Sequence, residues 1–360
     1  MIVPISTKLE LPGYTAPRWS VEDKIFYSKF HAVQQCEAVG WEWPSFNVWS
    51  EPGTFARPKL DFSQASSKQC EIISDSYSKV RLFYSGGRES HFMLCEMLRN
   101  KSKLDEIAIY RRFPGVVDSE TNEFDQFNII DVLVKTLADH DRKVPIKFYD
   151  LMPEHFNYYS SRLDQLYFAY TNLEFFAHGV HTVAECFPEI LEDDFVNLLG
   201  HAIPHVTDNK FYWIDMQFNM ANPDPYALHF FVDHRNPDLA VNLAYAVHDA
   251  NNKVSNWGSG KQKSFLPIKN KLNFDITGTK LDNKWGGVDV STNCYRWWMG
   301  KKDIVYHANA LKSDIGIQTM ANMINFYEQC EKKYSKYFEQ GCIYNTWVGG
   351  VSEKHTLTDV

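Results

Sequence analysis

The stretch "KVRLFYSGGRESHFML", residues 79–94, decides the fold that the sequence predicts. It opens with the apolar run "VRLFY", which has the length and composition of a strand buried on both faces of a sheet. Ser85, Gly86 and Gly87 follow at once, and "HFMLCEMLRN" then spaces its apolar residues as an amphipathic helix does. The stretch therefore predicts a strand, a tight glycine turn and a helix.

The same alternation continues downstream. "EIAIYRRF" (106–113) and "PIKFYDL" (145–151) have the composition of further strands, and "DFVNLLGHAIPH" (194–205) predicts a fourth strand that ends at Gly200. Between the first two of them, residues 124–140 place their apolar side chains on one helical face. Strands that alternate with helices predict an α/β fold with a parallel sheet, flanking helices and right-handed crossovers. Ligands of such sheets bind beyond the carboxyl ends of the strands, where the glycine turn would lie.

Changes in composition and hydrophobic periodicity divide the chain into three parts. Residues 1–75 contain clustered proline and tryptophan and show helical periodicity only around 21–38, so we expect an N-terminal accessory segment with little regular structure. Residues 76–255 hold the alternating strands and helices, including the helical stretch "DLAVNLAYAVHDA". Residues 256–360 are expected to form a basic loop followed by a helical C-terminal region, with helices over 310–340.

Composition limits the classes of function. The chain has 360 residues, of which 44% are hydrophobic and 23% charged, and its formal net charge of -8 gives no global attraction to nucleic acid or to an anionic membrane. The sequence contains no run of about 18 apolar residues, so we expect no membrane span. The residues after Met1 are not those of a secretory signal peptide. The seven cysteines contain no C-x-x-C pair, so we expect reduced thiols in a cytoplasmic protein. Cys95 lies in the helical apolar pattern, which favours a core position over a nucleophile.

A strand, a glycine turn and a helix are suited to holding phosphate. Glycine lets the backbone approach a ligand closely, and the helix N-terminus offers unpaired N–H groups and partial positive charge. Ser85 and Ser90 add hydroxyl donors and Arg88 adds a cation. Two standard phosphate loops are absent: no G-x-G-x-x-G follows the strand, and "GSGKQKS" (258–264) has Gln262 where the Walker pattern needs Ser or Thr.

Residues 85–90, "SGGRES", resemble the S-G-G-x-D-S signature of the PP-loop (N-type) ATP pyrophosphatases, a family that includes the synthetase domain of asparagine synthetase. The resemblance implies an adenine nucleotide alpha hydrolase-like (HUP) domain over 76–255 that binds the β,γ-diphosphate of ATP with Mg²⁺. It implies that Ser85, Gly86, Gly87 and Ser90 bind the diphosphate of the nucleotide. Arg88 is a further candidate for nucleotide binding because of its positive charge.

Glu89 stands where the family has aspartate, which keeps the charge and adds one methylene. The resemblance implies a catalytic role for Glu89 as a ligand of Mg²⁺. A partial second match is the pair Gly200-His201, which is similar to the G-H pair at a strand end near the nucleotide in several members. It suggests that His201 contacts the nucleotide, whereas a structural or surface histidine is the alternative.

A third match is the basic stretch "GKQKSFLPIKNK" at 260–271. Asparagine-synthetase-like domains have a C-terminal basic stretch whose Lys or Arg reaches the phosphates, and here Lys261, Lys263 and Lys269 are the candidates. We favour Lys263 as a catalytic residue, because the anchor Phe265-Leu266-Pro267 follows it directly. The alternative is a solvated basic loop.

Three hypotheses about function follow. The first is an AMP-forming ligase that adenylates a carboxylate or amide oxygen of a small substrate and transfers an amine or ammonia to it. Ile2 stands where a glutamine-hydrolysing domain would need cysteine, so ammonia would come free or from a partner subunit. The second is a PP-loop enzyme that modifies a nucleobase or tRNA, which the acidic net charge disfavours. The third is a catalytically inactive protein that binds nucleotide or a partner. Each hypothesis is compatible with a protein that forms a homo-oligomer.

Overall fold

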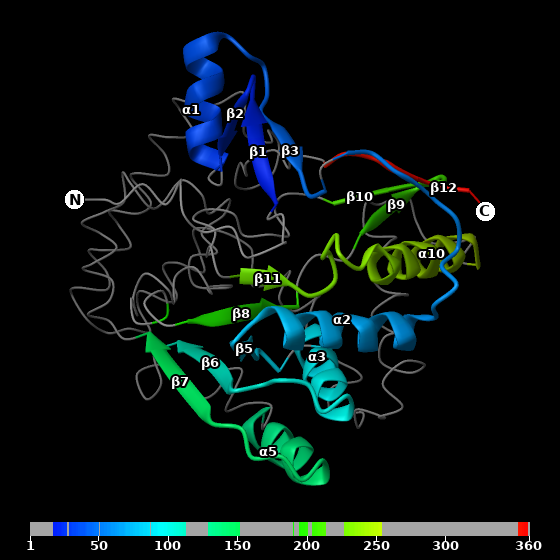
Figure 1. Ribbon diagram of the computed structural model, residues 1–360. Helices are drawn as coiled ribbons and strands as arrows, with labels where there is room; N and C mark the ends of the chain where they lie inside the picture. The colour runs from blue at the N-terminus through cyan, green and yellow to red at the C-terminus, as the bar shows by residue number, and fades with distance from the viewer. Residues whose placement is uncertain are drawn as a thin grey trace.

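The computed structural model of the protein describes residues 17–26, 29–49, 51–86, 88–112, 129–151, 190, 194–200, 204–213, 227–253 and 352–358. At its centre is a parallel sheet of five strands (Figure 1). These strands are β5 (Lys79–Phe83), β6 (Glu106–Arg112), β7 (Ile146–Leu151), β8 (Phe195–Leu199) and β11 (Ala227–His229). They follow the order β11-β8-β5-β6-β7, and each neighbouring pair is parallel.

This order places β5 in the middle of the sheet, next to a change of direction. From β5 the chain passes to β6 and then to the edge strand β7, whereas β8 and β11 return to the other side of β5. In open parallel sheets the ligand crevice lies beyond the carboxyl ends of the strands at this change of direction. The predicted α/β class, the parallel sheet and the strand at 79–83 are confirmed. The carboxyl ends of β5 and β8 are therefore the expected position of a ligand-binding site.

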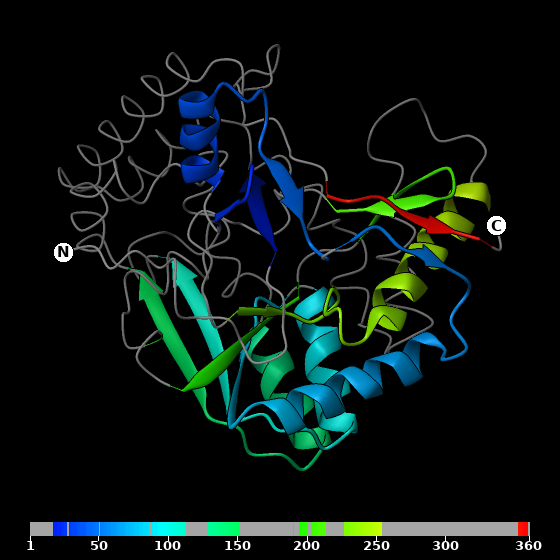
Figure 2. The same ribbon diagram turned by 45° about the horizontal axis from the view of Figure 1, so that its top comes forward.

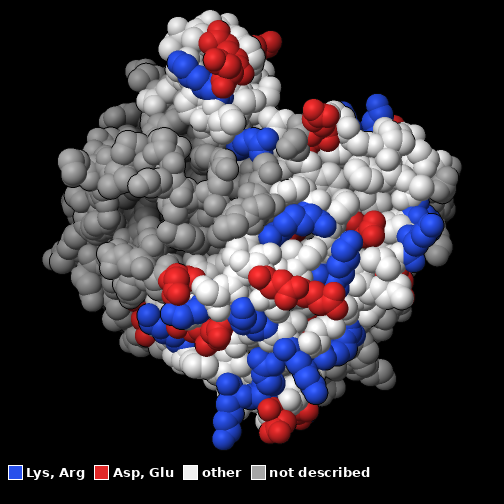
Figure 3. All heavy atoms as spheres, viewed as in Figure 1, with Lys and Arg blue, Asp and Glu red and all other residues white. Residues whose placement is uncertain are grey.

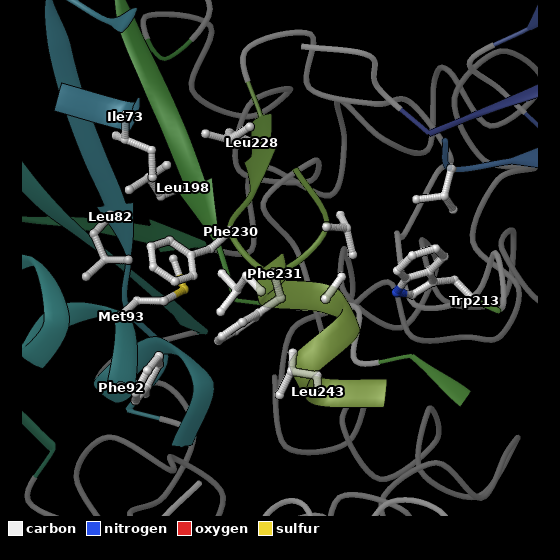
Figure 4. Close-up of a cluster of buried hydrophobic side chains, with 14 of the residues drawn as sticks. Ile73, Leu82, Phe92, Met93, Leu198, Trp213, Leu228, Phe230, Phe231 and Leu243 are labelled. Atoms are coloured by element: carbon white, nitrogen blue, oxygen red, sulfur yellow. The ribbon is translucent and has the colours of Figure 1, made fainter. Parts of the chain in front are cut away.

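Helices cover one face of the sheet and form the main core with it. They are α2 (Phe62–Ser76), α3 (Arg88–Arg99), α5 (Ile129–Asp139) and α10 (Pro237–Lys253). Leu82 of β5 and Leu198 of β8 face Met93 of α3 in this core, and Phe231 joins them from the segment that follows β11 (Figure 4). On the other face Phe83 and Leu199 belong to a second buried cluster, and burial on both faces explains why the strands read as near-continuous hydrophobic runs.

The opposite face of the sheet carries a buried ion pair. Arg81 of β5 is 1% exposed, and its Nε donates to Glu106 Oε1 at 2.6 Å. Its Nη1 donates to Asn197 Oδ1 at 3.1 Å, and its guanidinium carbon lies 4.3 Å from the centroid of the Phe195 ring. Arg81 pairs in register with Glu106 of β6 and with Asn197 of β8. These contacts therefore tie the three central strands together.

The N-terminal part has more regular structure than the sequence predicts. It holds β1 (Arg18–Val21), β2 (Lys24–Phe26), α1 (Lys29–Val39), β3 (Ser45–Asn47) and β4 (Thr54–Phe55) before α2. A capping box starts α2: Gln64 N donates to Asp61 Oδ1 at 2.8 Å, and Asp61 N donates to Gln64 Oε1 at 3.0 Å. Over residues 17–75 the expectation of little regular structure is wrong, although α1 overlaps the helical periodicity around 21–38. The strands were missed because they are too short to show a period, and Trp19 and Trp49 are core residues.

A second sheet joins distant parts of the chain. Its order is β4-β12-β10-β9, where β9 is His205–Thr207, β10 is Lys210–Tyr212 and β12 is His355–Leu357. Figure 2 shows β12 beside β4 and β10, so strands from the N-terminal, middle and C-terminal parts of the chain lie side by side. The strand that the sequence predicts here, ending at Gly200, is confirmed: β8 ends at Leu199, and His205 starts a strand of this other sheet. The boundaries at 75 and 255 stay predictions.

No helix among the described residues is both long and apolar enough to cross a membrane. The helices predicted over 310–340 and the basic stretch at 260–271 lie outside the described residues.

Candidate functional site

The candidate site is the corner between β5 and α3. Tyr84 N donates to Ala108 O at 2.9 Å, which continues the pairing of β5 with β6 for one more residue. The chain then leaves the sheet at Ser85. Gly86 has φ = 70°, in the left-handed region that glycine adopts without a steric penalty, and α3 begins at Arg88. This turn chemistry explains why a buried strand can feed directly into a helix.

Two hydroxyl groups meet at this corner. Ser90 Oγ accepts a hydrogen bond from Ser85 N at 3.3 Å and lies 3.2 Å from Ser85 Oγ. Ser85 is exposed, whereas Ser90 is buried in the first turn of α3. The corner therefore presents an exposed serine backed by a buried one, both at the positive end of a helix.

Gly200 brings the end of β8 against the same corner. A Cβ atom at Gly200 would lie 2.9 Å from Met93 Sδ, 3.0 Å from Glu89 Cβ and 3.1 Å from the backbone carbon of Glu89. Any larger residue here would have to push Met93 and the first turn of α3 away by a few tenths of an ångström, so glycine permits this close packing. The change of strand direction thus puts Glu89, half-buried in the first turn of α3, next to the end of β8.

Three polar side chains interact just inside the corner. Tyr84 Oη lies 3.0 Å from His91 Nδ1, and Cys95 Sγ lies 3.6 Å from His91 Nε2. Burial lowers the pKa of His91 to about 4 and raises the pKa of Cys95 to about 11, with the nearby Glu96 adding to the second shift. Burial also raises the pKa of Tyr84. All three groups are therefore neutral near pH 7, and Cys95 is a thiol rather than a nucleophilic thiolate.

The face of α3 that packs toward α2 carries another buried ionisable group. Burial raises the pKa of Glu96 to about 7, and the guanidinium of Arg99, which donates to its carboxylate, offsets part of that shift. Burial and the charge of Glu96 together raise the pKa of Cys70, on α2, to about 12. Arg99 also donates to Ser63 Oγ at 2.9 Å, so this cluster links the two helices.

Titration of His91 gives a first prediction. We expect the free energy of unfolding to fall as the pH drops from about 6.5 to about 4, because the unfolded chain binds a proton on His91 in this window and the folded chain does not. The contribution is about 3 kcal/mol. Urea unfolding of the wild type and of His91→Asn across this range measures it.

The difference in unfolding free energy between the wild type and His91→Asn isolates the contribution of His91. Burial lowers the pKa of His205 to about 4 as well, and the raised pKa of Glu96 acts in the opposite direction, but both are present in the variant. The stability difference between wild type and variant should therefore shrink on acidification. A difference that stays constant from pH 7 to pH 4 would contradict the buried, neutral state of His91.

The structure places the predicted residues unevenly. The corner brings together Ser85, Gly86, Glu89 and Ser90. The backbone of Arg88 starts α3, and its side chain is not among the described parts of the chain. The predicted residues that lie wholly outside it are Gly87, His201 and Lys263. The contact between Tyr84 and His91 cannot be predicted from the sequence, because no periodic pattern links the end of a strand to the second turn of a helix.

Among the described residues, no group of three or more His, Cys, Asp or Glu side chains could hold a metal ion. Such a group is not needed for Mg²⁺ that arrives with ATP, because this ion is usually held by one or two carboxylates together with substrate phosphates. Glu89 at the corner fits that arrangement as a single carboxylate.

No protein-family model, curated protein or solved structure matches this chain.

Proposed function

We propose that the protein is an AMP-forming ligase of the PP-loop type that binds ATP and Mg²⁺ at the corner between β5 and α3. The observation that carries the proposal is the position of this corner at the change of strand direction, where Gly86, the two serines and the first turn of α3 come together. The resemblance of residues 85–90 to the PP-loop signature supports the same assignment.

The corner suits a diphosphate for three physical reasons. Positive φ at Gly86 turns the backbone without a side chain in the way of the ligand. The start of α3 supplies unpaired N–H groups and partial positive charge. The hydroxyl groups of Ser85 and Ser90, now 3.2 Å apart, can turn toward phosphate oxygens and donate to them. Together they would hold the β- and γ-phosphates.

Glu89 has a separate role in this proposal. A carboxylate in the first turn of α3 would repel bare phosphate, but it becomes a ligand when a divalent cation lies between the two. Bound Mg²⁺ would supply charge neutralisation on the departing diphosphate. By the same resemblance, His201 would contact the nucleotide and Lys263 would reach the phosphates, and both assignments stay predictions.

With the diphosphate held, the α-phosphorus faces the acceptor. A carboxylate oxygen of a small substrate forms a bond to this phosphorus, the bond between the α- and β-phosphates breaks, and pyrophosphate leaves with the electron pair. Ammonia or an amine then attacks the adenylated carbon, loses a proton and displaces AMP. The corner acts by positioning the nucleotide and by stabilising charge on the leaving group.

Surface charge favours a small substrate over a polyanion. Figure 3 shows basic and acidic side chains interspersed on the described face around α2 and α3, rather than a field of one sign. The whole chain carries a net charge of -8. Proteins that bind nucleic acid without sequence preference instead neutralise phosphates with clustered Lys and Arg. A tRNA or DNA substrate is therefore the weaker alternative.

The experiment that tests the proposal compares nucleotide binding with turnover in Glu89→Gln. We expect the wild type to bind MgATP in a calorimetric titration, and the variant to lose turnover by about tenfold to a hundredfold, the range typical of a disturbed metal site. Its affinity for MgATP should fall less. Turnover is followed as ATP–pyrophosphate exchange with a panel of carboxylates.

Glu71→Gln is the matched control, because it makes the same chemical change at an exposed position of α2. It should leave binding and exchange unchanged. A wild type that binds no MgATP would refute the proposed function. Binding without exchange on any carboxylate would instead support an inactive nucleotide-binding protein.

A further inference from the structure

We infer that Tyr84 and His91 are positioning residues that hold the corner in its diphosphate-binding shape. This inference rests on the proposed function and adds to it the contact that orders the site. Tyr84 directly precedes Ser85, and His91 directly follows Ser90. The 3.0 Å contact between Tyr84 Oη and His91 Nδ1 therefore joins the two ends of the corner, and we call it the corner clip.

The corner clip differs from the serine contacts in what a ligand would do to it. The Ser85 hydroxyl and Ser90 Oγ lie 3.2 Å apart, and Ser85 N donates to that same oxygen at 3.3 Å. A bound diphosphate would compete for these same donors, so the serine contacts weaken as the ligand binds. The clip lies behind them, between side chains that are 2% and 4% exposed, and keeps its partners.

The His91 ring is held at both nitrogens. Nδ1 meets the Tyr84 hydroxyl and Nε2 meets Cys95 Sγ at 3.6 Å, one turn further along α3. A neutral imidazole carries one donor and one acceptor, so it can donate to one of these groups and accept from the other. With both ring nitrogens engaged, the ring cannot rotate freely, and the hydroxyl of Tyr84 stays fixed relative to the start of α3.

The position of the clip predicts which ligand groups depend on it. It orders the residues that would hold the β- and γ-phosphates, and it makes no contribution to the adenosine part of the nucleotide. Loss of the clip should therefore weaken ligands that carry a diphosphate and leave AMP binding unchanged. A hydrogen bond that served only overall stability would give no such difference.

The test uses full-length Tyr84→Phe, which removes only the hydroxyl. Titrations with MgATP, magnesium pyrophosphate and AMP should show the affinity for the first two falling by about tenfold, as expected for one lost hydrogen bond, with AMP unchanged. Tyr245→Phe is the matched control. Tyr245 is also buried and loses one bond, to Phe55 O at 3.0 Å, but it lies on α10. Its affinities should equal those of the wild type.

A second pair of variants covers a failure of Tyr84→Phe to fold. The amide nitrogen of asparagine can take the place of Nδ1, so His91→Asn should retain most of the affinity that His91→Ala loses. Equal affinities in His91→Asn and His91→Ala would overturn the clip, as would wild-type affinity in Tyr84→Phe. A wild type that binds neither MgATP nor pyrophosphate would refute the proposed function itself. Binding by the wild type with no effect of the variants would refute only the clip.

Discussion

Gly86→Val is expected to weaken MgATP binding by about tenfold to a hundredfold. Gly86 has φ = 70°, a conformation that a β-branched side chain adopts only with strain of about 1–3 kcal/mol. The chain would relieve this strain by rotating the turn, and the Ser85 and Ser90 hydroxyls would then no longer converge. Titration with MgATP measures the loss.

Gly40→Val separates strain from ligand binding. Gly40 has φ = 77° in the turn after α1, and a Cβ atom there would meet no other atom within 4 Å. The two substitutions therefore impose similar backbone strain, and both should lower the free energy of unfolding by about 1–3 kcal/mol. Only Gly86→Val should change the affinity for MgATP. Equal affinities in the two variants would show that the corner does not bind the nucleotide.

The second large effect is expected at Arg81. Arg81→Leu should lower the free energy of unfolding by about 1–3 kcal/mol, because the Glu106 carboxylate and the buried Asn197 amide each lose a hydrogen bond. Glu106, whose side chain is 15% exposed, still accepts a hydrogen bond from Tyr149 Oη at 3.2 Å. The double variant Arg81→Leu with Glu106→Leu should recover much of this loss, since it removes both charges together. Urea unfolding at pH 7 measures both differences.

Lys79→Ala is the control on the same strand. Lys79 Nζ lies 2.7 Å from Asp194 Oδ1, but both side chains are largely exposed to solvent, so this ion pair should contribute little to stability. A small loss in Lys79→Ala next to a large one in Arg81→Leu is the expected pattern. If Arg81→Leu cost no more than Lys79→Ala, the polar layer would not be tying the central strands together.

The part of the fold that the sequence predicts well is local. In residues 79–94 a buried strand, a glycine turn and an amphipathic helix follow one another, and each local signal agrees with the next. The structure has the strand at Lys79–Phe83 and the helix at Arg88–Arg99, with Gly86 at positive φ between them. Because these local signals agree with one another, the structure of this stretch could be predicted from the sequence without a homologous protein.

Pairing between distant segments could not be read in the same way. The neighbours of β5 in the sheet are set by packing, and Gly200 contributes because it lets β8 approach the first turn of α3. The pairing of β12 with β4 joins segments about 300 residues apart in the sequence through strands of three and two residues. Strands this short carry no alternating pattern that a sequence analysis could detect.

The sequence predicts those residues of the candidate site that belong to the turn itself, but not the contact that lies behind the turn. Ser85, Gly86, Glu89 and Ser90 belong to one short motif, so their proximity follows from the turn alone. Tyr84 and His91 meet only because of the angle at which α3 leaves the sheet. That angle depends on the backbone of Gly86 and on the packing at Gly200, which no composition or spacing reveals.

The measurement that tests the central claim most directly is the identity of the nucleotide product. Wild-type protein is incubated with MgATP, ammonium and a panel of small carboxylates, and the products are followed by ³¹P NMR. A corner that holds the β- and γ-phosphates exposes the α-phosphorus, so we expect AMP and pyrophosphate in equal amounts. ADP and orthophosphate would contradict the account, because transfer of the terminal phosphate needs that phosphate, not the α-phosphate, exposed to the acceptor.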